Sequence, residues 1–161
     1  MSELLATLLL GASLRLDLPE EAPTLGGVEI DVRYAVLPDA FVGLALGWGG
    51  GVNDTNPDRL LISQRIEALA LLGGRMPLTD TFALGATARA GIARLERWPR
   101  GALTSTQQFS PSVGGELTAL ASLTPTVALE PRLGLGFVRV KDDWRSVPGV
   151  ALGLLFTLDG P

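Results

Sequence analysis

The fold is decided by the stretch Gly27-Val28-Glu29-Ile30-Asp31-Val32-Arg33-Tyr34-Ala35-Val36-Leu37. Apolar and polar residues alternate along it one by one. The even-numbered positions from 28 to 36 are all apolar, and Glu29, Asp31 and Arg33 lie between them. In a β-strand, successive side chains point to opposite faces, so this period of two predicts a strand between an apolar and a polar environment.

The same alternation recurs along the chain of 161 residues, in segments separated by clusters of Gly, Pro, Asp and Asn. Helical periodicity is poor. Gln64 and Pro131 interrupt the apolar faces of their segments. We therefore expect a single domain, 1–161, with eight strands at Leu5–Leu18, Gly27–Leu37, Ala40–Gly49, Leu60–Leu72, Thr81–Leu95, Ser112–Leu123, Val127–Val140 and Val147–Leu158.

The connections between these segments alternate between short and long without exception. Three are tight and contain a proline, at 37–40, 76–80 and 124–126. Four are longer and polar or glycine-rich, at 19–26, 50–59, 96–111 and 141–146. Short turns at one end and longer loops at the other are typical of an up-and-down β-barrel that spans a membrane.

The composition of the two faces indicates which one points outward. The apolar faces are mainly Leu, Val, Ile and aromatic residues, whereas the polar faces combine small residues with a few long charged ones. Small residues leave room for charged side chains inside an eight-stranded barrel, whose interior is only just wide enough for side chains. Hydrophobic residues make up 47% of the chain, yet no apolar run approaches the ~20 residues of a spanning helix. We predict an all-β fold, a closed eight-stranded antiparallel up-and-down transmembrane β-barrel.

The polar faces carry five arginines and six carboxylates, which predict a network of charges in the lumen. Arginine suits forked pairing with buried carboxylates, and Lys141 is the only lysine. We expect pairs between neighbouring strands, such as Glu116 with Arg132. A solvated outer face of mixed charge is the alternative. The predicted lumen charge network consists of Arg15, Asp17, Glu29, Asp31, Arg33, Arg65, Glu67, Arg89, Glu116, Glu130 and Arg132.

Five aromatic residues on the apolar faces form a predicted aromatic girdle. With both termini in the periplasm, Tyr34, Phe82 and Phe156 fall near the periplasmic rim. Trp48 and Phe137 then fall near the outer rim. Aromatic belts at both membrane interfaces are expected for such barrels.

Composition excludes several classes of function. The formal net charge of −4 argues against a nucleic-acid partner. The chain has neither cysteine nor histidine, so we expect no metal site, no cofactor and no Ser-His-Asp triad. Ser63, Ser112 and Ser122 have no obvious base, and we predict that the chain is not an enzyme. Leu4–Leu10 is apolar, but no Lys or Arg precedes Arg15. We therefore expect a mature chain behind a start Met rather than a signal remnant; a secreted precursor would have lost its signal peptide upstream of this sequence.

In its alternating segments, alternating turn lengths and charged interior, the whole chain resembles the small eight-stranded outer-membrane barrels of bacteria, such as the OmpA transmembrane domain and OmpX. Val150–Leu158 is similar to the C-terminal assembly signal of these barrels, although Asp159-Gly160-Pro161 follow it. The resemblance implies the bacterial outer membrane as location, membrane lipid as partner with a contact to lipopolysaccharide, and a monomer.

These observations predict a structural or surface-exposed barrel whose lumen is plugged by charges and whose recognition, if any, lies in the outer loops. Arg97, Trp98, Arg100 and Phe109 are the candidate recognition residues of the loop predicted at 96–111. A narrow pore, a barrel that binds a small solute or ligand, and a soluble calycin-like lipid-binding barrel remain as alternatives.

Overall fold

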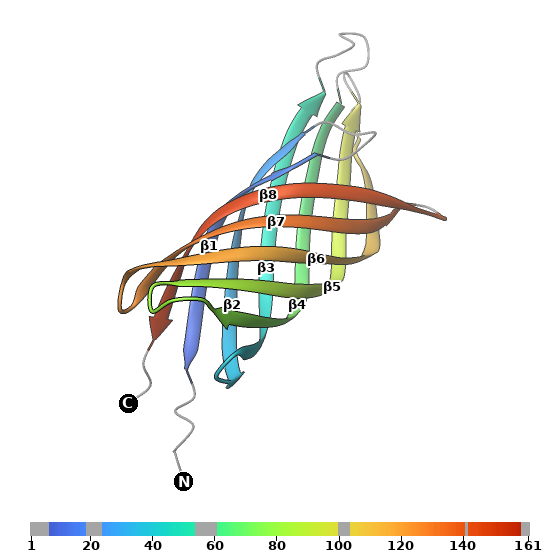
Figure 1. The fold of residues 1–161 in the computed structure, drawn as a ribbon. Coiled ribbons are helices and arrows are strands. Elements are labelled where there is room, and N and C mark those ends of the chain that lie inside the picture. The colour runs from blue at the N-terminus through green and yellow to red at the C-terminus, as the bar shows by residue number, and fades with distance from the viewer. Residues whose placement is uncertain (1–6, 19–23, 54–60, 100–103, 141, 159–161) are drawn as a thin grey trace.

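The computed structural model describes residues 7–18, 24–53, 61–99, 104–140 and 142–158. Eight antiparallel strands pair in sequence order, and β8 closes onto β1, which confirms the predicted barrel (Figure 1). The described residues form no helix of sufficient length and hydrophobicity to cross a membrane. The strands are β1 (Leu8–Asp17), β2 (Leu25–Leu37), β3 (Ala40–Asn53), β4 (Leu61–Pro77), β5 (Phe82–Pro99), β6 (Thr106–Thr124), β7 (Val127–Val140) and β8 (Asp143–Leu158).

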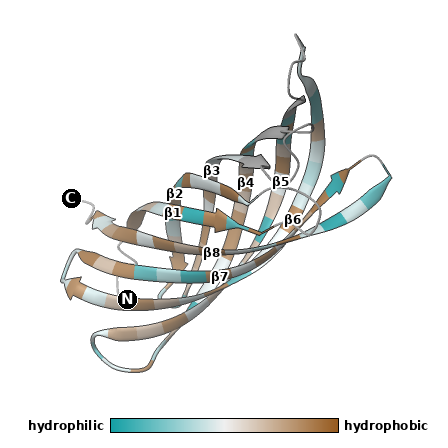
Figure 2. Cartoon of the chain, turned by 90° about the horizontal axis from the view of Figure 1, so that it is seen from above, coloured by the Kyte–Doolittle hydropathy of each residue, from teal (hydrophilic) through white to brown (hydrophobic). Residues whose placement is uncertain are grey.

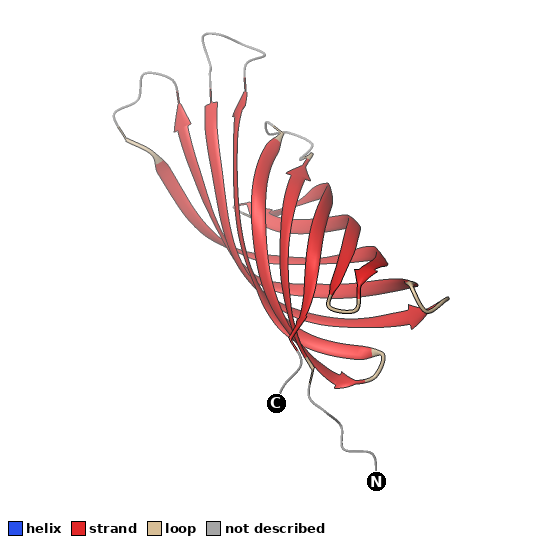
Figure 3. Ribbon diagram, turned by 90° about the vertical axis from the view of Figure 1, so that its left-hand side faces the viewer, coloured by secondary structure: helices blue, strands red, loops and turns tan. Residues whose placement is uncertain are grey.

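The two ends of the barrel differ in their connections. The start of β1, the end of β8 and the short turns lie at one end, here called the terminal side (Figure 3). The β2–β3 turn is closed by the pair Leu37↔Ala40 and the β6–β7 turn by Thr124↔Val127, each next to a shift in register. The remaining connections lie at the opposite end, here called the loop side (Figure 3).

On the loop side, the strands extend into segments that the sequence predicts as loops. The segment 96–111 is corrected most, because β5 reaches Pro99 and β6 begins at Thr106, with pairs from Ile92↔Pro111 to Arg97↔Thr106. Similarly, β3 continues to Asn53 and β8 begins at Asp143. A backbone ladder can continue above the apolar band, where both faces meet water. Apolar and polar residues therefore stop alternating before the hydrogen bonds end.

Pro131 lies at a gap in one ladder of the barrel. It pairs with Leu152 of β8. On its other side, the β6–β7 ladder pairs Thr118 with Arg132 and Ala121 with Leu129, and skips the two positions between. Because proline has no N–H to donate, this local gap explains how a central strand accommodates it.

The side chains are arranged opposite to those of a soluble barrel. Large apolar side chains cover the outside, as shown by Leu14 and Leu44, each 69% exposed, and Leu133, 61% exposed. The most buried large side chains include Glu130 and Asp31, at 0% and 1% exposure. Figure 2 shows brown hydrophobic segments interrupted by paler or teal ones along most strands. A surface of this kind is matched to lipid rather than to water.

Candidate functional site

The predicted charged residues all lie on the inward face of the barrel wall. They come from β1, β2, β4, β5, β6 and β7, and those of one strand share its inward face. None of their side chains is more than 14% exposed. This geometry excludes the alternative of a solvated outer face. Buried ions of this kind are tolerated only where they have partners of opposite charge.

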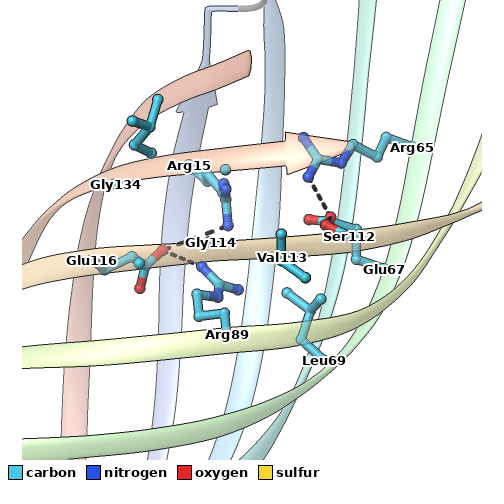
Figure 4. A pocket seen from close by; sticks show the side chains of 13 residues that line it. Arg15, Arg65, Glu67, Leu69, Arg89, Ser112, Val113, Gly114, Glu116 and Gly134 are labelled. Atoms are coloured by element: carbon cyan, nitrogen blue, oxygen red, sulfur yellow. Dashed lines mark hydrogen bonds and ion pairs between the residues drawn. The ribbon is translucent and has the colours of Figure 1, made fainter. Parts of the chain in front are cut away.

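Glu29 of β2 is the centre of the network. Its Oε2 accepts hydrogen bonds from Arg15 Nη1 at 3.2 Å and from Arg89 Nη2, and its Oε1 accepts one from Arg132 Nη1 at 2.8 Å. These three arginines come from β1, β5 and β7, so one carboxylate joins strands from different sides of the barrel. Arg89 also donates to Glu116, which lies 3.6 Å from Arg15 Nη1 (Figure 4).

A second group of four residues lies towards the terminal side. Arg33 donates from both Nη atoms to the two carboxylate oxygens of Glu130, each at 2.7 Å, and from Nε to Asp31 at 2.5 Å. Arg132 donates from Nε to Glu130 at 2.8 Å and from Nη2 to Asp31 at 2.9 Å. Forked arginine–carboxylate pairs combine charge with fixed geometry, and therefore hold β2 and β7 together across the lumen.

A third group lies towards the loop side. Asp17 accepts from Arg15 Nε at 2.6 Å and from Arg65 Nη1 at 3.4 Å. Arg65 also donates to Glu67, and Ser112 Oγ donates to the same Glu67 oxygen at 2.9 Å. Arg15 is thus shared between this group and Glu29. The structure joins all eleven predicted residues into one continuous network of ion pairs.

Some partners differ from the expected ones. Glu116 pairs with Arg89 and Arg15, and not with Arg132 of the neighbouring strand. Arginine side chains are long enough to cross a narrow lumen, so partners are set by position around the barrel as well as by strand adjacency.

Apolar groups that the sequence analysis missed lie on the inward face on both sides of the network. Leu9, Leu120 and Leu155 pack together near the terminal side. Ala93, Val138 and Val147 pack together near the loop side. A further cluster contains Phe41, Ala45, Leu69 and Leu71. The lumen therefore has ionic pairs in its middle and apolar packing towards both ends.

Phe41 brings a further arginine to the network. The centroid of its ring lies 5.1 Å from Cζ of Arg33 and 5.4 Å from Cζ of Arg75. The Nε and Nη2 atoms of Arg75 are buried without a hydrogen-bond partner. Stacking on an aromatic ring stabilises a cation that has no carboxylate. The sequence did not indicate this role, because Phe41 lies within a continuous apolar run, 40–46.

The predicted aromatic girdle lies on the outward face. Tyr34 and Trp48 are about half exposed, Phe82 and Phe137 are exposed, and Phe156 is partly exposed. Phe109 and Trp144 add two exposed aromatic residues near the loop side. Outward aromatic side chains are therefore present towards both ends of the barrel.

The candidate recognition residues are only partly placed. Arg97 and Trp98 belong to β5, and Phe109 to β6, rather than to a loop. Phe109 is 73% exposed. Arg100 lies outside the described residues, as do the side chains of Arg97 and Trp98. Within the described ranges, no group of acidic residues has the arrangement of a metal site.

No family model matches the chain, and no curated protein matches it in sequence. Solved structures do match over nearly the whole chain. Ail, the attachment invasion locus protein of Yersinia pestis, is 12% identical, with a TM-score of 0.61 and coverage of 95% of this chain and 97% of that one.

Two further structures agree. Neisserial surface protein A is 15% identical, with a TM-score of 0.63 and coverage of 96% and 97%. The N-terminal β-barrel domain of Pseudomonas aeruginosa OprF is 16% identical, with a TM-score of 0.61 and coverage of 92% and 97%. At sequence identities this low, the similarity shows a shared fold and nothing more. The chain has the fold of the small eight-stranded outer-membrane β-barrels.

Proposed function

We propose that the chain is an integral protein of the bacterial outer membrane, whose lumen is closed by the ion-pair network. The observation that carries the proposal is the inverted arrangement of side chains, with Leu44 and Leu133 exposed and Glu29 and Glu130 buried. A soluble calycin-like barrel places apolar side chains inside, so this arrangement argues against that alternative.

The height of the apolar outer surface supports the assignment to a membrane. On β5 the outward residues are apolar from Phe82 to Ile92, and the next outward residue is Arg94. At the usual rise and a tilt of about 40°, this stretch spans roughly 26 Å. The apolar band of outer-membrane barrels is about 25 Å tall. On β7, Arg139 likewise follows Phe137.

The lumen supports a closed barrel rather than a pore. Two cavities beside the network, of about 20 Å³ and 10 Å³, are large enough for water molecules only. The apolar clusters around Leu9 and around Val138 add a barrier to ions near either end. We propose a structural role without enzymatic activity, and the narrow, charge-filled lumen supports it.

The proposal is tested by the requirement for an amphiphile. The purified chain should be monodisperse in detergent micelles and should fold into phospholipid vesicles, because its outer surface needs an apolar medium. In a protease-protection assay on vesicles, the strands should remain uncut. A chain that stays monodisperse and folded without detergent would overturn the membrane assignment.

A second function, recognition at the loop side, is favoured by one feature of β6. Thr106–Pro111 pairs with β5, and in the described ladders no β7 residue pairs with it. A free strand edge can accept an extended segment of another protein. Exposed Phe109 lies on this stretch.

The role of this edge can be tested on cells. Ail is named for attachment, and we propose the same class of role here. Cells that display the chain should attach to cultured host cells more than cells without it, and Phe109→Ala should reduce the difference. Equal attachment with and without the chain would contradict this role.

We further propose that the chain acts as a monomer in contact with membrane lipid, including lipopolysaccharide. In support, the ladder closes within one chain through the β1–β8 pairs. Outward Arg94 and Arg139 lie where lipid phosphates would be expected, directly beyond the apolar band. Mass measurement in micelles and retention on immobilised lipopolysaccharide test the two statements separately.

A further inference from the structure

Among the arginines that point into the lumen from the described strands, Arg75 alone has no carboxylate partner. It lies on β4 towards the terminal side, where it is paired with Gly85 of β5 and stacks on the inward ring of Phe41. All six carboxylates of the lumen charge network contact other arginines. No acidic side chain of the described residues therefore neutralises the charge of Arg75 directly.

Only one end of this guanidinium is open to a ligand. The Nε and Nη2 atoms of Arg75 are enclosed by the protein and have no hydrogen-bond partner. The residue as a whole is nevertheless partly exposed, which leaves Nη1 as the nitrogen that a ligand can reach. A guanidinium donates hydrogen bonds and accepts none, so the N–H groups of Nη1 can bind an acceptor oxygen that the buried nitrogens cannot reach.

The surroundings of Arg75 favour an anion as the ligand. A second cation, Arg33, stacks on the same ring, with its Cζ 5.1 Å from the centroid. The carboxylates beside Arg33, which belong to Asp31 and Glu130, are already engaged in the ion-pair network. Apolar side chains fill much of this end of the lumen, and charges attract one another more strongly in such surroundings than in water. These side chains are Leu9, Leu120 and Leu155.

We propose that Arg75 is a binding site for an oxyanion at the terminal-side end of the lumen, where a phosphate or carboxylate group accepts hydrogen bonds from Nη1. Arginine suits these two groups because it combines a permanent charge with donors in a fixed plane. The ligand reaches the site from the terminal side, since the ion-pair network fills the lumen beyond it. This inference goes beyond the proposed function, which assigns no ligand to the lumen.

The site can be tested by nuclear magnetic resonance on the folded wild-type protein in nonionic detergent micelles. Inorganic phosphate is titrated in place of chloride at constant ionic strength. We expect the backbone amide signals of Phe41 and Gly85, which adjoin Arg75, to shift and reach saturation. The signal of Gly49, towards the loop side, should stay in place. Shifts that do not saturate, or no shifts at all, would overturn the proposal and leave Nη1 merely hydrated.

The same titration in nanodiscs of phosphatidylglycerol distinguishes the two sources of such a group. Amide signals that titrate as they do in micelles assign the site to a soluble anion. Signals that respond to phosphate in micelles but no longer respond in the nanodiscs show that a lipid headgroup already occupies the site. Both results support an oxyanion site at Arg75 and name its ligand.

A pair of arginine variants tests whether Arg75 itself holds the anion. Arg75→Gln removes the charge, and we expect it to abolish the saturable shifts. Arg139→Gln is the matched control, because the side chain of Arg139 is 49% exposed on the outer face, and it should titrate like the wild type. Saturable shifts that persist in Arg75→Gln would place the anion elsewhere and contradict the assigned site. The wild-type titration needs no variant, so the proposal stays testable even if Arg75→Gln fails to fold.

Discussion

Replacing Glu29 with glutamine removes the charge at the centre of the network while keeping the shape of the side chain. Glu29 is 2% exposed and contacts Arg15, Arg89 and Arg132. Removing one partner from a buried ion pair costs about 3–5 kcal/mol, because the remaining charges stay buried without compensation. We expect Glu29→Gln to lower the free energy of unfolding by about this amount, which corresponds to a factor of more than 100 in the folding equilibrium.

The assay is reversible unfolding in urea or guanidinium, with the barrel folded into phospholipid vesicles. Asp142→Asn is the matched control, because Asp142 is 99% exposed and pairs with Arg139 at 3.6 Å in water. It should leave the unfolding curve unchanged. If Glu29→Gln lowers the free energy of unfolding no more than Asp142→Asn does, the network does not stabilise the barrel.

A double-mutant cycle separates the pair from its surroundings. Combining Glu29→Gln with Arg132→Gln should be less destabilising than the sum of the single changes, with a coupling of about 0.5–3 kcal/mol. Simple additivity would show that the 2.8 Å contact between Glu29 Oε1 and Arg132 Nη1 contributes nothing specific.

Three further outcomes are expected. Leu133→Arg, in the middle of the outward apolar stretch of β7, should lower the free energy of unfolding in vesicles by about 2–4 kcal/mol. Ser146→Arg, near the loop side, should lower it by about 0–1 kcal/mol. Equal losses would argue against a lipid-facing band. Phe41→Leu should lower the free energy of unfolding by roughly 1–2 kcal/mol, because the stacking with Arg33 and Arg75 is lost. Equilibrium unfolding that matches the wild type would contradict this stacking. Proteolytic cleavage within 100–103 should leave a barrel that still migrates as a folded species in unheated gels, and loss of that species would show that the β5–β6 connection is needed for stability.

The strands and their facing could be predicted because period-two alternation is strong wherever one face meets lipid and the other meets a polar lumen. Leu14, Val32 and Leu152 show the signal clearly, since each is flanked by small or charged residues. The alternation of short and long connections then set the direction of each strand. No long-range information is needed for this level of the fold.

The apolar side chains in the lumen were hidden in apolar runs. Leu9 lies between Leu8 and Leu10, and Leu155 between Leu154 and Phe156, so the inward residue cannot be told from its lipid-facing neighbours. The extension of β5 and β6 was hidden for the opposite reason. Beyond the apolar band, polar residues such as Gln107 can occupy either face of a strand, and the pattern that marks strands is absent.

The composition of the ion-pair network could be predicted, but not its connections. Each charged residue stands on the polar side of an alternating segment. Pairs such as Arg33 with Glu130 join residues 97 positions apart, and they depend on which strands face each other across a closed barrel. The shear of the barrel sets that relation, and the spacing of residues along one strand does not contain it.

Conductance in a planar lipid bilayer tests most directly the claim that the lumen of this barrel is closed. We expect single wild-type barrels, inserted with controls for orientation and incorporation, to show no steady conductance, because ion pairs around Glu29 cross the lumen and apolar clusters lie near both ends of the described strands. A stable open channel in the wild-type protein, with an ion selectivity that changes in Arg89→Ala, would contradict a closed lumen and establish a pore.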